Sequence, residues 1–230
     1  MNTTKIGKYT VNYENEKEFH TLKSEIFSSE CYSTNLTSET PTIIDVGAYI
    51  GLSVIYFKSV YPKSYIQAFE PNPFAREILK ENIFINNLDN VEILPYAVDL
   101  EERERYFFIN KTDMNWQSTG SFSQKSWNGK SVNDTPIEVK TKKLSTFLDK
   151  DVDILKIDIE GLESNILKEC RHLLKNVKVI LLEYHPVKEN LSDVISLLKG
   201  QNFQISYFKD GKEIKTPQKK DLLILKAEGV

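Results

Sequence analysis

The sequence predicts an α/β fold with a mostly parallel β-sheet between layers of helices, on three observations. From residue 41 onward, apolar β-branched runs of strand length alternate with amphipathic segments of helix length. A glycine-bearing turn follows the first of these strands, and an acidic residue follows the second. Because a helix between two strands places them parallel in one sheet, this alternation favours right-handed β-α-β units.

The first 40 residues are predicted to form a strand and a helix outside the main sheet. Residues 9–13 resemble a short strand, and residues 16–27 place apolar side chains at helical spacing. We expect this extension, residues 1–40, to be able to cover a ligand site as a lid. Pro41 marks the start of the main domain, which we assign to residues 41–230.

The main domain is expected to be regular except for an insertion near residues 101–139. In that insertion, residues 106–109 and 137–139 are predicted to be strands on either side of a polar segment at 116–121. The remaining strands are predicted at 42–46, 65–69, 91–94, 153–158, 178–183, 203–208 and 222–226. Helices are predicted at 52–60, 74–86, 162–174 and 191–199.

Residues 42–51 predict a strand, a tight loop and the start of a helix, the opening unit of a nucleotide-binding sheet. Gly47 and Gly51 lack Cβ atoms, so with Ala48 they could let a ligand lie against the loop backbone. A dinucleotide-binding loop has glycine where this chain has Asp45, because a pyrophosphate must sit on the helix N-terminus. The charge of Asp45 would repel a phosphate and attract an ammonium group, which favours S-adenosylmethionine.

A second candidate binding residue, Glu70, follows the second predicted strand. An acid at this strand tip is placed to accept hydrogen bonds from both ribose hydroxyls. Alternatively, Glu70 is a solvated carboxylate beside a turn. Prolines on either side of Asn72 stiffen the loop and leave its side chain free to hydrogen-bond. Tyr96 and Ala97, after the third strand, are expected near the adenosine.

The overall composition disfavours several classes of protein. The chain has 30 basic and 33 acidic residues, a net charge of −3 and no basic stripe, which argues against nucleic acid as a partner. No apolar run approaches the ~20 residues that span a bilayer, and no signal peptide is evident. Two isolated cysteines, Cys31 and Cys170, favour reduced thiols in a cytoplasmic protein. The oligomeric state stays open.

Charged side chains interrupt the two apolar strands that follow the insertion. Lys156 and Asp158 share a face of the first strand, and Glu160 comes just after it. Glu183 and His185 end the second strand. Because ligands of open α/β sheets bind outside the carboxyl ends of the strands, these side chains should converge there.

Four of these residues also have a structural alternative. Lys156 and Glu183 could form an ion pair between neighbouring strands, since a buried lysine needs a carboxylate. Glu160 could cap the helix that follows it. His185 could be an ordinary turn residue, although a histidine with a pKa near ~6.5 is the simplest base for a hydroxyl proton.

Four motifs together resemble the FkbM family of S-adenosylmethionine-dependent methyltransferases: Asp45-Val46-Gly47-Ala48-x-x-Gly51, Phe69-Glu70-Pro71-Asn72-Pro73, Leu155-Lys156-Ile157-Asp158-Ile159-Glu160-Gly161-x-Glu163 and Leu182-Glu183-x-His185. The resemblance implies a class I methyltransferase fold, a Rossmann-like sheet of seven strands in the order 3-2-1-4-5-7-6 with the last strand antiparallel. It also implies O-methylation of a hydroxyl on a sugar, a polysaccharide unit or a natural product.

For such a reaction, the sulfonium ion already activates the methyl group, so holding donor and acceptor in line supplies much of the rate. His185 is the first candidate for the base that takes the hydroxyl proton, Asp158 is the second, and Glu183 completes the candidate catalytic group. Alternatively, a divalent cation, most naturally Mg²⁺, could bind among Asp158, Glu160, Glu183 and His185 and acidify the hydroxyl.

Two other classes of function stay open. An NAD-dependent oxidoreductase could share this sheet, although Asp45 replaces the glycine that a pyrophosphate needs. A non-catalytic scaffold or glycan-binding module could keep the fold, although the loop glycines and both acids argue against it. For a methyltransferase, the acceptor is expected to be a small molecule or a glycan.

Overall fold

The structure, a computed structural model, describes residues 1–28, 30–110, 118–124, 135–186 and 190–229. Part of the polar segment predicted at 116–121 therefore lies outside the described residues. Within the described part of the chain, no helix is both long enough and apolar enough to cross a membrane.

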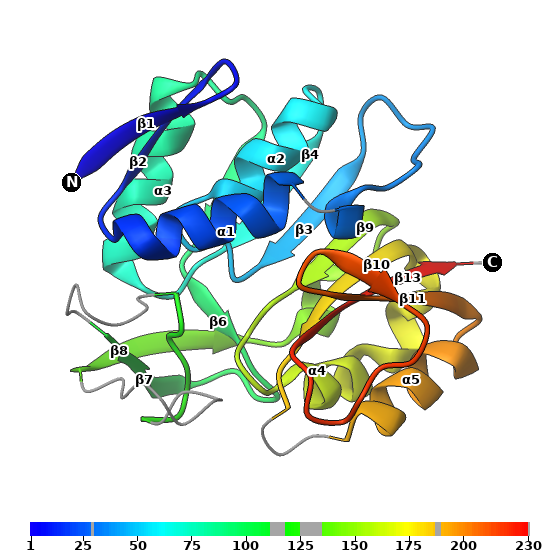
Figure 1. The fold of residues 1–230 in the computed structure, drawn as a ribbon. Coiled ribbons are helices and arrows are strands. Elements are labelled where there is room, and N and C mark those ends of the chain that lie inside the picture. Colours follow the sequence, from blue (N-terminus) through cyan, green and yellow to red (C-terminus); the bar gives the residue numbers. More distant parts are fainter. Residues whose placement is uncertain (29, 111–117, 125–134, 187–189, 230) are drawn as a thin grey trace.

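An eight-stranded sheet forms the centre of the molecule (Figure 1). Its strands, in spatial order, are β12 (Lys212–Ile214), β11 (Phe203–Lys209), β13 (Leu223–Gly229), β10 (Val177–Tyr184), β9 (Val152–Ile157), β3 (Thr42–Val46), β4 (Tyr65–Phe69) and β5 (Val91–Leu94). β13 runs antiparallel to both of its neighbours, and β3, β4, β5, β9 and β10 are parallel to one another.

The predicted strand order, 3-2-1-4-5-7-6 with the last strand antiparallel, is confirmed. The prediction of seven strands was short by one, because β12 pairs with β11 as a hairpin at the edge of the sheet. Asp210 and Gly211 turn this hairpin with positive φ angles of 50° and 75°. An Asp-Gly pair between two strand-like runs is the usual signal for such a turn.

Helices cover both faces of the sheet (Figure 1). One face carries α1 (Glu16–Ser28), α2 (Leu52–Val60) and α3 (Pro73–Ile85). The other carries α4 (Glu163–Cys170), the 3-10 helix η3 (Arg171–Asn176) and α5 (Leu191–Gly200). The single helix predicted at 162–174 is therefore an α-helix followed by a 3-10 helix.

The N-terminal residues form an antiparallel hairpin of β1 (Asn2–Ile6) and β2 (Tyr9–Tyr13), followed by α1 and the 3-10 helix η1 (Glu30–Tyr32). Asn82 of α3 holds β2 through two hydrogen bonds. Its Oδ1 accepts from the N–H of Asn12 at 2.7 Å, and its Nδ2 donates to the carbonyl oxygen of Asn12 at 3.0 Å. The extension is thus attached to the main domain by hydrogen bonds.

The insertion contains more regular structure than the sequence predicts. β6 (Tyr96–Val98), β8 (Thr135–Lys142) and β7 (Glu104–Ile109) form a separate three-stranded sheet in that order, and the 3-10 helix η2 (Leu144–Phe147) follows β8. β6 is parallel to β8, and β7 is antiparallel to it.

Strand residues of the central sheet point alternately into two apolar cores, one on each face. Ile44 and Leu155 belong to one core, and Ile43 and Ile154 belong to the other. Strands buried on both faces read as continuous apolar runs, which is why they were visible in the sequence. The packing on both sides fixes the carboxyl ends of β3, β4, β9 and β10 at one edge of the sheet.

Candidate functional site

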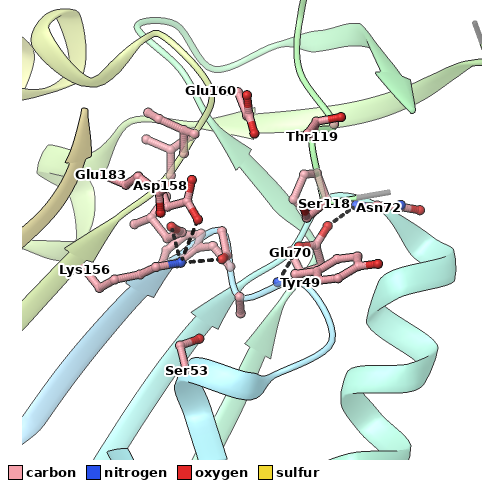
Figure 2. A pocket seen from close by; sticks show the side chains of 18 of the residues that line it. Tyr49, Ser53, Glu70, Asn72, Ser118, Thr119, Lys156, Asp158, Glu160 and Glu183 are labelled. Carbon is pink, nitrogen blue, oxygen red and sulfur yellow. Dashed lines mark hydrogen bonds and ion pairs between the residues drawn. The ribbon is translucent and has the colours of Figure 1, made fainter. Parts of the chain in front are cut away.

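A cavity of about 430 Å³ opens where β3, β4, β9 and β10 end. Most of the residues singled out from the sequence line it: Gly47, Ala48, Glu70, Asn72, Tyr96, Ala97, Asp158, Glu160, Glu183 and His185. Asp45 and Gly51 are not part of its wall. Figure 2 shows two groups of polar side chains that face each other, one around Lys156 and one around Glu70.

Glu70 is buried at the end of β4, and backbone N–H groups fix its carboxylate. The N–H of Tyr49 donates to Oε2 at 2.8 Å, and the N–H of Asn72 donates to Oε1 at 2.7 Å. Burial raises the pKa of Glu70 from 4.5 to about 7, although these hydrogen bonds and the charges of Lys156 and Arg76 act in the opposite direction. With 6% of its surface exposed, Glu70 is not the solvated turn residue of the alternative interpretation.

Asn72, Tyr96 and Ala97 line the cavity together with Glu70. The Oδ1 atom of Asn72 accepts a hydrogen bond from the N–H of Phe74 at 3.0 Å and so caps α3. The side-chain oxygen of Asn72 is therefore used within the protein, and a hydrogen bond from its amide group to a ligand stays a prediction. Tyr96 and Ala97 belong to β6, which contacts β4.

Asp45 is fully buried below the cavity wall and is paired within the protein. The register of β3 and β9 places it opposite Lys156, whose Nζ atom is 3.2 Å from Asp45 Oδ1. Lys156 Nζ also donates to the carbonyl oxygen of Gly47 at 2.6 Å, and Ser53 Oγ donates to Asp45 Oδ2 at 2.5 Å. The expected direct contact between Asp45 and a ligand ammonium group is corrected to a supporting role, in which Asp45 holds Lys156 against the loop backbone.

Lys156 forms a structural ion pair, but not with the expected partner. Its ammonium group pairs with Asp45 and lies 3.5 Å from Asp158 Oδ2, instead of pairing with Glu183. The register explains this, since Leu181 of β10 is the residue opposite Lys156. Burial alone would lower the pKa of Lys156, but the charges of Asp45 and Asp158 hold it above its usual value.

Gly47 and Gly51 allow close packing within the protein. Their φ angles are 86° and 89°, a region in which glycine carries the least strain. A Cβ atom on Gly47 would overlap the backbone carbonyl oxygen of Asp158, and one on Gly51 would overlap the side chain of Leu79. The glycines therefore seat this loop against the end of β9 and against α3. Gly47 also lines the cavity, so the contact of its backbone with a ligand stays a prediction.

His185 is buried among three glutamates just after β10. Its Nδ1 atom is 2.7 Å from Glu163 Oε1, and its Nε2 atom is 3.8 Å from both Glu160 Oε2 and Glu183 Oε1. Burial lowers the pKa of His185, but the three carboxylates outweigh burial and raise the pKa well above 6.5. The carboxylates thus favour the protonated form of the imidazole over the neutral form that a base requires.

Two of the carboxylates around His185 have raised pKa values, and two residues that line the cavity have a strained backbone. Burial, opposed by His185, raises the pKa of Glu160 from 4.5 to about 8, and burial with the charge of Asp158 raises that of Glu183 well above its usual value. Glu160 and Tyr49 have left-handed backbones, with φ of 60° and 49°. Such strained residues concentrate at active sites and ligand clamps.

Residues from both ends of the chain complete the cavity. Helix α1 contributes Leu22, Glu25 and Ile26, and Leu222 and Ile224 come from the last strand and the residue before it. Burial and the charge of Asp158 raise the pKa of Glu25 to about 7. Sequence reasoning missed Glu25. Its place on one helix face with Leu22 and Ile26 is the signal that could have identified it, because an acid among apolar side chains is unusual.

Glu18, also on α1, connects the extension to the binding loops. It is 1% exposed, its Oε2 accepts from the hydroxyl of Tyr49 at 3.0 Å, and its Oε1 accepts from the N–H of Ser118 at 2.7 Å. Tyr49 and Ser118 both line the cavity. Sequence reasoning missed this residue, although Glu18 lies four residues before Leu22 and so on the same face of the helix.

Several known proteins are similar in sequence to this chain. A model of the methyltransferase FkbM domain matches residues 45–205. "Methyltransferase 1" of Beauveria bassiana is 28% identical over 211 residues, which cover 83% of this chain and 82% of that protein. "31-O-demethyl-FK506 methyltransferase FkbM" of Streptomyces tacrolimicus is 24% identical over 223 residues, which cover 85% and 86%. "2-O-methyltransferase NoeI" of Sinorhizobium fredii is 25% identical over 160 residues, which cover 65% of each chain.

Solved structures share the fold. A methyltransferase FkbM from Methylobacillus flagellatus superimposes with a TM-score of 0.57 at 15% identity, over 84% of this chain and 44% of that one. M. jannaschii TYW2 in complex with AdoMet gives a TM-score of 0.52 at 14% identity, over 99% and 86%. The fold is that of class I methyltransferases, and the family match covers most of the chain, including the cavity. The chain therefore belongs to the FkbM family of S-adenosylmethionine-dependent methyltransferases.

Proposed function

We propose that the protein transfers a methyl group from S-adenosylmethionine to a hydroxyl oxygen of a small molecule or a glycan. One observation carries this proposal. A single cavity holds a carboxylate suited to a diol, Glu70, a group of acidic side chains able to accept a proton, and an apolar wall from α1 and β13. The first feature would serve the methyl donor, the second the acceptor hydroxyl, and the third the rest of the acceptor.

The residues present fit S-adenosylmethionine. Glu70 can accept hydrogen bonds from both ribose hydroxyls, Tyr96 and Ala97 offer a wall for the adenine, and the loop backbone at Gly47 can hold the methionine end. When bound, the cofactor supplies a methyl group on a positive sulfur, so that an O–C bond forms as the S–C bond breaks and the sulfur keeps the electron pair.

The chain's own residues have two tasks in this reaction. Lys156 fixes the loop after β3 through Gly47, and positioning of donor and acceptor can supply about 7–11 kcal/mol of the barrier. We assign acceptance of the hydroxyl proton to the deprotonated form of Glu160, which lines the cavity and whose buried Oε2 accepts no hydrogen bond from the described residues. Because the pKa of Glu160 is about 8, methyl transfer should rise as the pH increases through that value. Asp158 is the second choice, because Lys156 lies 3.5 Å from its carboxylate.

The acceptor is proposed to be a sugar, a polysaccharide unit or a natural product. Leu22, Ile26 and Ile224 can pack against a sugar ring or a carbon skeleton, and Glu25 can accept a hydrogen bond from a neighbouring hydroxyl. The names of NoeI and of the Streptomyces relative specify oxygen as the methylated atom in those proteins. The acidic cavity and the net charge of −3 support an acceptor other than nucleic acid, and a cytoplasmic location is part of the proposal.

Two measurements test the proposal. S-adenosylhomocysteine should raise the melting temperature by binding the native state, and NAD should not. Tritiated S-adenosylmethionine, offered with a panel of monosaccharides, oligosaccharides and hydroxylated polyketides, should give a labelled product that resists alkaline hydrolysis, as a methyl ether does. Label found only in base-labile esters or on nitrogen would contradict the proposal. Stabilisation by NAD alone would favour an oxidoreductase, and cofactor binding without transfer to any acceptor would favour a non-catalytic module.

Glu70→Gln is expected to weaken S-adenosylhomocysteine binding by about 1–3 kcal/mol, because a charge-assisted hydrogen bond to the ribose is lost. In the unmodified protein, affinity should fall about tenfold from pH 8 to pH 6, because Glu70, with a pKa of about 7, becomes protonated and loses an acceptor site. Titration calorimetry of both proteins at pH 6, 7 and 8 measures the effect.

Comparison of the two pH profiles isolates Glu70, because the other acids of the cavity titrate in both proteins. An equal dependence of affinity on pH in the two proteins would contradict the assignment of Glu70 to the ribose.

The pH dependence of the stability of the ligand-free protein provides a second check on Glu70. Because folding raises the pKa of Glu70 from 4.5 to about 7, the ligand-free protein should lose stability as pH rises between these values, and Glu70→Gln should lose less.

Glu18→Ala tests the proposal that residues 1–40 cover the cavity. The substitution removes the acceptor for Tyr49 and Ser118, so S-adenosylhomocysteine binding should weaken about tenfold, which corresponds to ~1.4 kcal/mol. Glu16→Ala is the matched control, because Glu16 lies on the same helix with 72% of its side chain exposed. If calorimetry gives the same affinity for Glu18→Ala and Glu16→Ala, α1 has no part in cofactor binding.

A further inference from the structure

We propose that Asp158, Glu183 and His185 bind a divalent transition-metal ion, with Mn²⁺ as the best match, beside the place of the acceptor hydroxyl. Its part in methyl transfer rests on the proposed function, but metal binding itself can be measured without any acceptor. One candidate ligand atom from each of the three residues lies within 4.8 Å of the others. All three residues line the cavity, so an ion held by them would face a bound substrate.

The sheet itself brings the ligands together. Ile157 of β9 and Leu182 of β10 are paired in parallel register, and Asp158 and Glu183 are the residues that follow them. The two carboxylates therefore leave adjacent strands at the same level, before any loop conformation is considered. His185 follows two residues after Glu183, which returns its side chain to the same side of the chain.

Glu163 holds the ring of His185 in the orientation of a metal ligand. Its Oε1 is 2.7 Å from His185 Nδ1, which leaves Nε2 directed at Glu183 Oε1, 3.8 Å away. Glu163 is itself fixed, since the same Oε1 accepts from the N–H of Gly161 at 2.9 Å and the residue is fully buried. A carboxylate on the far ring nitrogen is the usual outer partner of metal-binding histidines, and the ion displaces the ring proton as it binds.

Glu160 supplies an independent observation that points to a cation. Its side chain is 9% exposed, and its Oε2 accepts no hydrogen bond from the described residues although it is 3.8 Å from His185 Nε2. Glu160 does not cap α4, whose N-cap residue is Leu162. Figure 2 shows its carboxylate directed into the cavity. A buried carboxylate oxygen without a hydrogen bond is costly unless a ligand satisfies it.

The donor atoms of the three ligand residues indicate which kind of ion would bind. The expectation from the sequence was Mg²⁺, the ion that a set of ligands rich in oxygen suits. An imidazole nitrogen among them favours a first-row transition ion, and Mn²⁺ accepts carboxylates and imidazole together. An ion at this position would lower the pKa of an acceptor hydroxyl placed beside it. Glu160 would remain available to receive the proton.

Titration of metal-free full-length protein with MnCl₂ tests the site, with unbound Mn²⁺ followed by electron paramagnetic resonance. We expect one bound ion per chain at micromolar affinity and a nitrogen coupling from His185 in the pulsed spectrum. Asp158→Asn and Glu183→Gln should each weaken binding at least tenfold. Glu163→Gln, which keeps all three ligands, should weaken it about 10–100-fold. Glu77→Gln is the control, because Glu77 is an exposed glutamate paired with Lys80 on α3.

Each of the following results decides either on the metal site or on the proposed function. Equal Mn²⁺ affinity in the unmodified protein and in Asp158→Asn and Glu183→Gln would overturn the proposal. So would a bound ion without nitrogen coupling, a result that does not depend on whether a variant folds. Binding of S-adenosylhomocysteine without binding of Mn²⁺ would remove the metal site and leave the proposed function standing. Binding of Mn²⁺ without any binding of S-adenosylhomocysteine would remove the proposed function instead.

Discussion

Lys156→Ala is expected to lower the free energy of unfolding by about 3–5 kcal/mol, because it leaves a buried carboxylate without its counter-charge. Lys156 is 4% exposed, and its ammonium group lies 3.2 Å from Asp45 Oδ1. Without it, Asp45 retains the hydroxyl of Ser53 as its hydrogen-bond donor. The loop after β3 also loses the hydrogen bond to the carbonyl oxygen of Gly47. Urea unfolding followed by circular dichroism measures the change.

The double variant Asp45→Asn, Lys156→Ala is the matched control for this prediction. Removing both charges eliminates the unpaired carboxylate, so the double variant should be more stable than Lys156→Ala alone. Should the single variant unfold like the unmodified protein and yet lose all methyl transfer, Lys156 would be acting on the substrate and its structural role would be wrong.

Glu160→Gln is expected to reduce the rate of methyl transfer ~10²–10⁴-fold, because the amide cannot accept the hydroxyl proton. Affinity for S-adenosylhomocysteine should change little, since Glu70 rather than Glu160 serves the ribose in our assignment. The rate is measured with the acceptor that gives most product in the tritium experiment, and kcat and KM are determined separately. A loss confined to KM would show that Glu160 binds the acceptor and leaves its proton to another group.

Measurements with His185→Ala and with EDTA separate the remaining routes. If a metal ion acidifies the hydroxyl, EDTA should stop transfer, Mn²⁺ should restore it, and His185→Ala should resemble the chelated protein. If His185 is the base, His185→Ala should lose activity while EDTA has no effect on the unmodified protein. Full transfer by Glu160→Gln in the presence of EDTA would exclude both Glu160 as the base and the metal, leaving Asp158, the second choice, to be tested in the same way.

The fold was predictable because its signals are local. Apolar runs buried on both faces mark each strand, and the loop glycines mark the turn after β3. The strands that were not predicted are β1, β6 and β12. β12 was locally encoded by Asp210 and Gly211, a turn signal that our interpretation of the sequence did not use. Element existence follows from the periodicity of neighbouring residues, so a single sequence suffices.

The candidate site was only partly predictable, because its contacts depend on register between strands. Asp45 was expected to meet a ligand, but one neighbouring strand places Lys156 directly opposite it. The register of β9 and β10 places Leu181, and not Glu183, opposite Lys156. The role of Gly47 depends on the close approach of Asp158, more than 100 residues later in the chain. Pairings of this kind leave no trace in the spacing of residues along the sequence.

The cavity wall draws on Leu22 and Ile26 near the start of the chain and on Leu222 and Ile224 near residue 230. During synthesis, the strands that carry Glu70 and Asp158 leave the ribosome well before β13 does. In our proposal, the acceptor wall is complete only when the last strand has inserted between β10 and β11. Leu223, Leu225 and Ala227 of this strand are buried in the core, so a polypeptide cut short before Leu222 would lack both part of that wall and an interior strand of the central sheet.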